Sequence, residues 1–236
     1  MRKTSLLLLL ILTTSCSQGK DEITDVRNAL NEKYPNMPIL GIQKLNDSFF
    51  EINIDDQLYY LTSDYKHLIA GNIIDFQTGL NLTENSLEKK RRDYISKINN
   101  KDLITYSPKK VNHSVTIFTD TSCPYCQKMH NEVKKLVANN IEVNYILFSR
   151  NEEDEDAYNE MVSVWCSDNQ IKSLDMVFNN SSITAKTCDN PIKNNYIKAR
   201  DLRVNGTPMI FTENGLVVPG YVSSDKLIEI LEKSAN

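Results

Sequence analysis

Two cysteines three positions apart, placed where an apolar strand meets a helix, constrain this chain more than any other feature. The apolar run 115–118 predicts a strand, and a short polar turn separates it from Cys123 and Cys126. A helix is predicted to follow, because apolar residues recur at spacings of four, four and three positions, at Tyr125, Met129, Val133 and Leu136. The cysteine pair therefore lies at the start of a helix, directly after a strand.

Pro124 fixes where this helix begins. Proline is favoured at the first helical position, where its missing N–H costs nothing, so Cys123 is predicted to be the N-cap residue. The unpaired N–H groups and the positive end of the helix dipole would stabilise a thiolate there and lower the pKa of Cys123. Cys126 lies one turn deeper and is better shielded. The pattern is typical of dithiol–disulfide exchange, in which Cys123 attacks and Cys126 resolves.

Three other interpretations of the pair are weaker. A zinc site could use Cys123, Cys126 and His130, but no second ligand pair of the usual spacing lies nearby. Covalent haem attachment requires a histidine directly after the second cysteine, and Gln127 occupies that position. An inert structural pair would not explain why a helix begins immediately after a strand. No metal or other cofactor is therefore expected.

The first fifteen residues have the features of an export signal. Arg2 and Lys3 are basic, 6–12 is an apolar run, and small residues follow at 13–16. Seven apolar residues are too few to span a bilayer as a helix. The whole chain has 236 residues and a formal net charge of −4, so nothing in its charge suggests a nucleic-acid partner.

Cys16 indicates how the exported chain begins. The stretch 12–16, Leu-Thr-Thr-Ser-Cys, resembles the lipobox of bacterial lipoproteins, in which the cysteine is acylated and becomes the first residue. That family usually has leucine three positions before the cysteine, whereas this chain has Thr13 there. Ordinary cleavage after Ser15 is the alternative. Cys16 is the odd one of five cysteines, which favours lipidation. We expect a lipoprotein-type signal at 1–15 and a polar tether at 16–24.

The next segments predict a small α+β unit followed by a linker helix. One helix, 25–34, and four strands, at 39–45, 49–54, 57–61 and 67–76, are predicted within an N-terminal domain at 25–82. A unit of this size has little core and commonly gains stability by association. The stretch 83–105 is predicted to be a charged linker helix, in which the basic cluster 89–92 is solvated rather than a nucleic-acid or membrane site.

The remaining residues, 106–236, show an alternation of strands and helices. Strands are predicted at 113–120 and 141–148, on either side of the helix that carries the cysteines. A helical region extends to about Phe178, and another helix opens after Pro191. A hairpin is predicted around 213–215, Glu-Asn-Gly, and a final helix begins at 223–224.

These features together resemble the periplasmic disulfide isomerases of the DsbC/DsbG type. The resemblance covers nearly all of the chain after the signal and depends on four anchors: Phe-Thr-Asp at 118–120, Cys-Pro-Tyr-Cys at 123–126, the later pair Cys166 and Cys188, and Gly-Thr-Pro at 206–208. The inner Pro-Tyr resembles the DsbG branch, whereas the later cysteine pair resembles DsbC. The resemblance implies a small N-terminal α+β dimerisation domain, a linker helix and a thioredoxin-like catalytic domain with a helical insertion.

The resemblance also implies roles for four residues beyond the Cys-Pro-Tyr-Cys pair. The equivalent of Pro208 has a cis peptide bond and lies against the sulfurs, and Thr207 tunes the cysteine pair. An ordinary trans proline entering the strand is the alternative. Cys166 and Cys188 are expected to form a structural disulfide, since the compartment is oxidising. A second redox-active pair is the alternative, although its spacing is not that of a CxxC motif.

Three functions follow, all in the bacterial periplasm. The first is a homodimeric disulfide isomerase that acts on misfolded or misoxidised exported proteins and is kept reduced by an inner-membrane thiol reductase of the DsbD type. Reduction of sulfenylated thiols is a variant of it. The second is a thiol oxidase that donates its disulfide. The third is a chaperone-like binding module. No nucleic acid is expected, and the membrane is expected to be reached only through the lipid on Cys16.

Overall fold

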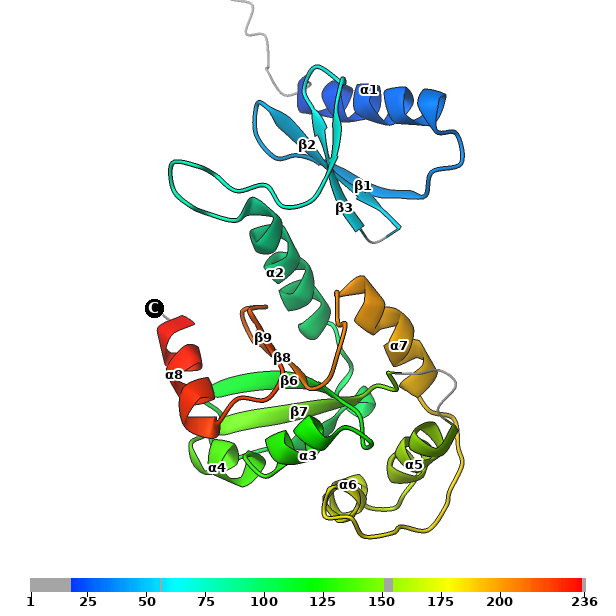
Figure 1. The fold of residues 1–236 in the computed structure, drawn as a ribbon, viewed down its shortest axis with the longest axis vertical. Helices are drawn as coiled ribbons and strands as arrows, with labels where there is room; N and C mark the ends of the chain where they lie inside the picture. Colours follow the sequence, from blue (N-terminus) through cyan, green and yellow to red (C-terminus); the bar gives the residue numbers. More distant parts are fainter. Residues whose placement is uncertain (1–17, 56, 151–154, 235–236) are drawn as a thin grey trace, which may run out of the picture. The chain divides into compact units, whose positions relative to one another are not determined.

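The computed structural model describes residues 18–55, 57–150 and 155–234 (Figure 1). The expected signal and Cys16 lie outside the described residues. The chain forms two compact units, Met1–Asn72 and Ile73–Asn236. Each combines helices with a sheet, in agreement with the expected mixture of an α+β unit and an α/β domain. No helix in the described ranges is long and apolar enough to cross a membrane.

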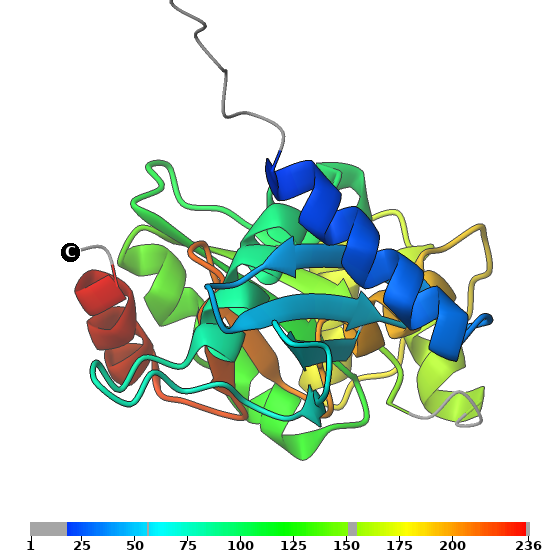
Figure 2. The same cartoon turned by 90° about the horizontal axis from the view of Figure 1, so that it is seen from above.

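The first unit is a four-stranded antiparallel sheet with one helix over it. The sheet order is β1-β2-β3-β4, so each strand pairs with the next along the chain. Figure 2 shows α1 lying obliquely over the strands. The helix contributes Val26 and Leu30, four positions apart, to a core with Phe50, Ile52 and Leu61. The bounds are α1 Gln18–Lys33, β1 Ile39–Lys44, β2 Phe49–Ile54, β3 Gln57–Thr62 and β4 Leu68–Ala70.

Two parts of this unit differ from the expectation. Helix α1 begins at Gln18, within the segment expected to be a polar tether. Strand β4 ends at Ala70, although the sequence pattern predicted a strand to Phe76. The strand ends where Gly71 takes a φ of 152°. A turn over 76–78 then follows, in which the Asp75 carboxylate accepts the backbone N–H groups of Gln77 and Thr78.

Helix α2, Leu82–Ile95, is shorter than the expected linker helix and packs within the second unit. Asn81 caps it by accepting the Glu84 N–H. Arg91 was expected to be solvated but is only 5% exposed, because its guanidinium donates to the Glu84 carboxylate and lies 5.5 Å from the Phe211 ring. The compact units divide between Asn72 and Ile73, so α2 belongs with the domain that follows it.

The second unit is a five-stranded mixed sheet with helices on both faces (Figure 1). The strand order is β5-β7-β6-β8-β9, and only the central pair, β6 and β7, is parallel. Strand β5 lies in the segment expected to be linker, after a short 3-10 turn, η1. The bounds are η1 Asn100–Asp102, β5 Ile104–Tyr106, β6 His113–Thr119, β7 Ile141–Leu147, β8 Met209–Thr212 and β9 Val217–Pro219.

The helices divide between two cores. Along β6, Ile117 faces the core that includes α3, α4 and α8, whereas its neighbour Phe118 faces the core that includes α7. The helical insertion, α5 and α6, joins the first of these cores. The helix predicted after the cysteines is interrupted after His130 and continues as α4. The bounds are α3 Pro124–His130, α4 Val133–Ala138, α5 Glu155–Trp165, α6 Gln170–Phe178, α7 Ile192–Asp201 and α8 Ser224–Ser234.

Candidate active site

The two cysteines lie at the start of α3, as the sequence predicts. Cys123 is the N-cap residue with an extended backbone (φ −89°, ψ 117°), and Pro124 is the first helical residue. The Cys123 carbonyl accepts the Cys126 N–H at 3.0 Å. The turn before it is held by Asp120, whose Oδ1 accepts the backbone N–H and the hydroxyl of Ser122 at 2.8 and 2.7 Å. This turn connects the end of β6 to the helix.

The segment that precedes β8, the strand beside β6, forms the other side of the site. Strand β8 runs antiparallel to β6 and pairs Met209 with Phe118, which brings the residues before Met209 to the end of β6. The Thr207–Pro208 bond is cis. The Cys123 thiol donates a hydrogen bond to the Thr207 carbonyl oxygen at 3.3 Å, across 84 positions of sequence. The structure therefore brings the two segments expected to carry the catalytic residues into contact.

The surroundings of Cys123 favour its thiolate. Burial acts to raise the pKa of Cys123, but the Thr207 hydroxyl and the N–H groups of Cys126 and Tyr125 stabilise the anion, and the pKa lies below its ordinary value. The Thr207 hydroxyl is buried and has no hydrogen-bond partner within the described chain. It is therefore free to donate to the sulfur once the thiolate forms.

Cys126 has the opposite character. Its exposed fraction is 0%, against 3% for Cys123, and both thiols are free. Burial raises the pKa of Cys126 to about 12, although the hydroxyls of Thr119 and Thr207 partly offset that effect. At neutral pH the site therefore holds one sulfur that ionises readily and one that keeps its proton.

Arg150 is a site residue that the sequence analysis missed. Its Nε donates to the Asp120 carboxylate at 2.9 Å and its Nη2 donates to the Ser122 hydroxyl at 3.2 Å. The hydrogen bond to Asp120, together with the negative charges of Asp120 and of the ionised cysteines, raises the pKa of Arg150. By the same interaction, the guanidinium charge favours the Cys123 thiolate. The order strand, helix, strand in the sequence could have indicated Arg150. Two strands joined by a helix usually run parallel, as β6 and β7 do, and the residues that follow their carboxyl ends meet at one sheet edge.

His130, considered above as a zinc ligand, is hydrogen-bonded to protein groups instead. Its Nε2 lies 3.0 Å from the Asp175 carboxylate and its Nδ1 3.3 Å from the Tyr145 hydroxyl. Within residues 18–234, apart from the undescribed positions, no group of three or more His, Cys, Asp or Glu side chains could hold a metal ion.

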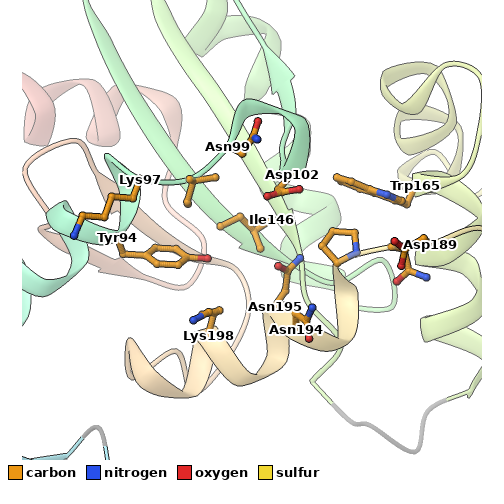
Figure 3. A pocket seen from close by; sticks show the side chains of 13 residues that line it. Tyr94, Lys97, Asn99, Asp102, Ile146, Trp165, Asp189, Asn194, Asn195 and Lys198 are labelled. Atoms are coloured by element: carbon orange, nitrogen blue, oxygen red, sulfur yellow. The ribbon is translucent and has the colours of Figure 1, made fainter. Parts of the chain in front are cut away.

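Cys166 and Cys188 are joined by a disulfide, with Cα atoms 5.7 Å apart. It links the end of α5 to the irregular segment that precedes α7. A cavity of about 670 Å³ adjoins this region (Figure 3). It is lined by the end of α2, the first part of α7 and residues beside the disulfide, including Tyr94, Asp102, Trp165, Asp189, Asn195 and Lys198. None of Cys123, Cys126, Thr207 and Pro208 lines it, so it is separate from the cysteine site.

A mixed sheet with a buried cysteine pair at the start of a helix, faced by a cis proline, defines a thioredoxin-like thiol–disulfide oxidoreductase. Residues 100–235 match the thioredoxin-like domain family, and residues 16–84 match the disulfide bond isomerase protein N-terminal domain. The thiol:disulfide interchange protein DsbC of Escherichia coli K12 is 34% identical over 176 residues, which cover 74% of this chain and 72% of that protein. The DsbC of Pasteurella multocida is 30% identical over 227 residues, 94% of this chain and 98% of that protein. The chain belongs to the DsbC family of thiol:disulfide interchange proteins.

Solved structures support the fold. A disulfide interchange protein from Neisseria gonorrhoeae aligns with a TM-score of 0.52 at 23% identity, over 58% of this chain and 97% of that one. Proteus mirabilis ScsC in a transitional conformation aligns with a TM-score of 0.54 at 16% identity, over 64% and 79%. The family and the fold establish this chain as a thiol:disulfide oxidoreductase.

Proposed function

We propose that this protein is a disulfide isomerase that rearranges wrongly paired disulfides in exported proteins through Cys123 and Cys126. The observation that carries the proposal is the opposite character of the two buried sulfurs. The pKa of Cys123 is lowered by hydrogen bonds that outweigh its burial, whereas burial raises the pKa of Cys126 to about 12. The first sulfur is therefore prepared to attack, and the second stays protonated until it is needed.

The exchange proceeds through a mixed disulfide. The Cys123 thiolate attacks one sulfur of a substrate disulfide, so a new S–S bond forms, the old one breaks, and the other substrate sulfur leaves as a thiolate. A substrate thiolate can then attack the mixed disulfide, which restores Cys123 and leaves the substrate rearranged. Alternatively, Cys126 attacks Cys123, releases the substrate reduced and leaves the Cys123–Cys126 disulfide. The Thr207 carbonyl, which accepts a hydrogen bond from the Cys123 thiol in the free protein, then becomes available to accept one from a substrate N–H.

Single replacements of the two cysteines test these roles. We expect Cys123→Ser to abolish exchange, and Cys126→Ser to accumulate mixed disulfides with substrate. Thiolate ultraviolet absorbance, followed against pH on a protein that lacks the other cysteines, gives the pKa of Cys123. An unshifted Cys123 beside a depressed Cys126 would reverse the assignment.

The resting redox state distinguishes an isomerase from a thiol oxidase. An isomerase must be held reduced, and we propose that an inner-membrane thiol reductase of the DsbD type does this. An oxidase would rest oxidised. The match of residues 16–84 to an isomerase N-terminal domain supports the isomerase. Trapping of thiols in intact cells, followed by gel mobility, makes the comparison. A resting Cys123–Cys126 disulfide would favour the oxidase, and selective reaction with sulfenylated proteins would favour their reduction as the main role.

We propose further that the protein is a homodimer joined through its N-terminal unit, and that the dimer shelters unfolded substrate in the manner of a chaperone. The four-stranded sheet has two open edges, β1 and β4, and each carries an exposed leucine: Leu40 at 58% and Leu68 at 40% exposure. Open edges are ready sites for pairing with a second copy.

Charge placed on each edge tests the dimer. Leu40→Lys and Leu68→Lys should differ in their effect on dimerisation. Only one of the two edges pairs with a second copy, so the variant at the other edge is the control. The variant at the pairing edge should sediment as a monomer that still reduces simple disulfides but no longer reactivates a scrambled multi-disulfide protein. A monomeric unmodified protein, or two dimeric variants, would contradict pairing through these edges.

We propose, finally, that the chain is exported to the periplasm and held at a membrane by lipid on Cys16. Cys16→Ser should then abolish fatty-acid labelling and release the protein into the soluble periplasmic fraction. An unlabelled, soluble unmodified protein would favour ordinary cleavage after Ser15.

A further inference from the structure

The resolving step sets a problem that the cysteine pair alone does not solve. Cys126 has an exposed fraction of 0%, and its thiol must lose a proton before it can attack the mixed disulfide at Cys123. Its raised pKa leaves very little thiolate at neutral pH. Because no bulk water reaches the sulfur, the proton needs an acceptor inside the protein.

A buried histidine lies one turn further along the same helix. Cys126 and His130 are four positions apart on α3, so their side chains share a face. The His130 Nδ1 lies 3.3 Å from the hydroxyl of Tyr145, whose exposed fraction is 0%. The charge of an ionised Cys126 contributes to the raised pKa of Tyr145, after burial itself, so the hydroxyl lies within electrostatic reach of the sulfur.

Asp175 connects this histidine to the surface. Its Oδ1 lies 3.0 Å from the His130 Nε2 and accepts the Tyr106 hydroxyl at 2.7 Å. The side chain of Asp175 is 46% exposed, whereas that of His130 is 9% exposed. The histidine ring is also packed against Phe178, with ring centroids 4.7 Å apart. The chain of polar groups therefore runs from the buried Tyr145 hydroxyl, through His130, to a carboxylate in water.

These contacts define the protonation of His130. A carboxylate accepts, so Nε2 carries the proton and donates to Asp175, which leaves the lone pair of Nδ1 to accept the Tyr145 hydroxyl. Burial lowers the pKa of His130, while Asp175 opposes that effect and the charge of Lys134 adds to it, so the ring is neutral at neutral pH. The titratable groups that face the ring are thus Asp175, Tyr145 and Tyr106, with Lys134 nearby and Cys126 one turn away.

We propose that His130 is the proton acceptor for Cys126 in the resolving step, with Tyr145 as the carrier and Asp175 as the counter-ion. This inference rests on the proposed role of Cys126 as the resolving thiol. No hydrogen bond joins the Cys126 sulfur to the Tyr145 hydroxyl within the described residues, so the hydroxyl must first move toward the sulfur. The Cys126 proton then passes to the Tyr145 oxygen as the Tyr145 hydroxyl proton passes to the His130 Nδ1. The products are a Cys126 thiolate and an imidazolium paired with Asp175. The thiolate then attacks Cys123, the substrate sulfur leaves with the electron pair, and the imidazolium proton returns to solvent past Asp175.

The resolving step can be timed separately from the first attack with a coloured disulfide reagent, dithiobis(nitrobenzoate). Attack by Cys123 releases one coloured thiolate at a rate proportional to reagent concentration. Attack by Cys126 on the resulting mixed disulfide releases the second at a rate independent of it. We expect His130→Gln in the full chain to slow the second phase by about 100-fold, the lower end of the range of general acid–base catalysis, and Tyr145→Phe to slow it by a smaller factor. Both variants should leave the first phase unchanged.

The pH profile separates proton acceptance from a structural role. In the unmodified protein, the second phase should slow as pH falls through the pKa of His130, because the protonated ring cannot accept. In His130→Gln that dependence should vanish, and the second phase should stay slow across the same pH range. His113 is a matched control, because its Nδ1 is also paired with a carboxylate, that of Glu213 at 2.9 Å, but it lies at the opposite end of β6 from the cysteines.

The outcomes are distinct. A second phase in Cys126→Ser would mean that Cys126 is not the resolving thiol, and the proposed function would need revision. A single phase there, with an unchanged rate and pH profile in His130→Gln, would overturn the role of His130 alone. Equal slowing by His113→Gln would also overturn it. If His130→Gln does not fold, Tyr145→Phe decides, because it removes only the hydroxyl; a second phase as fast as that of the unmodified protein would exclude the relay.

Discussion

Removal of the Cys166–Cys188 disulfide should lower the stability of the second unit without changing the chemistry at Cys123. The bridge closes the end of α5 onto a segment, 179–191, that has no helix or strand of its own. Apart from the bridge, the described hydrogen bonds between α5 and this segment are those between the Ser163 hydroxyl and the backbone of Lys186. Replacement of both cysteines by alanine therefore frees the segment but opens no large cavity, since Cys188 is exposed and Cys166 half-buried.

The magnitude follows from the length of the closed loop. The two cysteines are 22 positions apart. In the chain-entropy treatment, a loop of this length restricts the unfolded chain enough to stabilise the folded state by about 3 kcal/mol. At about 3 °C per kcal/mol for a domain of this size, the melting temperature should fall by about 10 °C.

Calorimetry of the unmodified protein and of the double variant Cys166→Ala with Cys188→Ala measures the loss. The control is a reductant strong enough to open the bridge. It should lower the melting temperature of the unmodified protein to that of the double variant, so that the two no longer differ. The rate at which Cys123 reacts with a disulfide reagent should stay the same in both. A loss below about 1 kcal/mol would refute the entropy argument. Opening of this bridge as readily as that between Cys123 and Cys126 would refute its structural role.

Four further substitutions test the surroundings of the site and of α2. Arg150→Met should raise the pKa of Cys123 by about one pH unit and slow its attack by up to about tenfold at pH values below that pKa, with no difference at alkaline pH where the thiolate is complete. A rate–pH profile shows this. Thr207→Val should also raise the pKa of Cys123. An unchanged rate–pH profile would show that the Thr207 hydroxyl does not stabilise the thiolate. Gly215→Ala should destabilise by about 1–3 kcal/mol in urea, because φ is +85° and an added Cβ would meet the backbone of α2. Gly220→Ala, with φ +75° and open space, should cost less.

The cysteine pair could be predicted from sequence because every part of the signal is local. An apolar strand, a polar turn, Pro124 and an apolar helical spacing lie within about twenty residues, and each contributes to one geometry. The hairpin strand Met209–Thr212 was predicted for the same reason, since 213–215 is a strong turn signal. The placement of Thr207 beside Cys123 came instead from the resemblance to known isomerases.

The features that sequence patterns missed depend on contacts between distant segments. Arg150 reaches the site only because β7 runs parallel to β6. His130 and Asp175 meet only because α6 packs beside α3. Strand β5 has three residues, too few to show the alternation of apolar and polar side chains that marks a strand in a sequence. It forms because it pairs with the edge of β7. Arg91 looked like one charge in a solvated basic cluster, and only the position of Phe211 shows why it is buried.

The two threonine hydroxyls beside the sulfurs explain how a buried site can favour an ionised cysteine. The Thr119 and Thr207 hydroxyls are both buried and have no hydrogen-bond partner within the described structure. A buried donor without an acceptor costs about 1–3 kcal/mol, and this cost is carried by the neutral dithiol form. Formation of a thiolate supplies the missing hydrogen-bond acceptor and so removes part of this cost. Since Thr207 acts on both sulfurs and Thr119 acts on Cys126, the same hydroxyls can follow the charge as it moves from the attacking to the resolving sulfur.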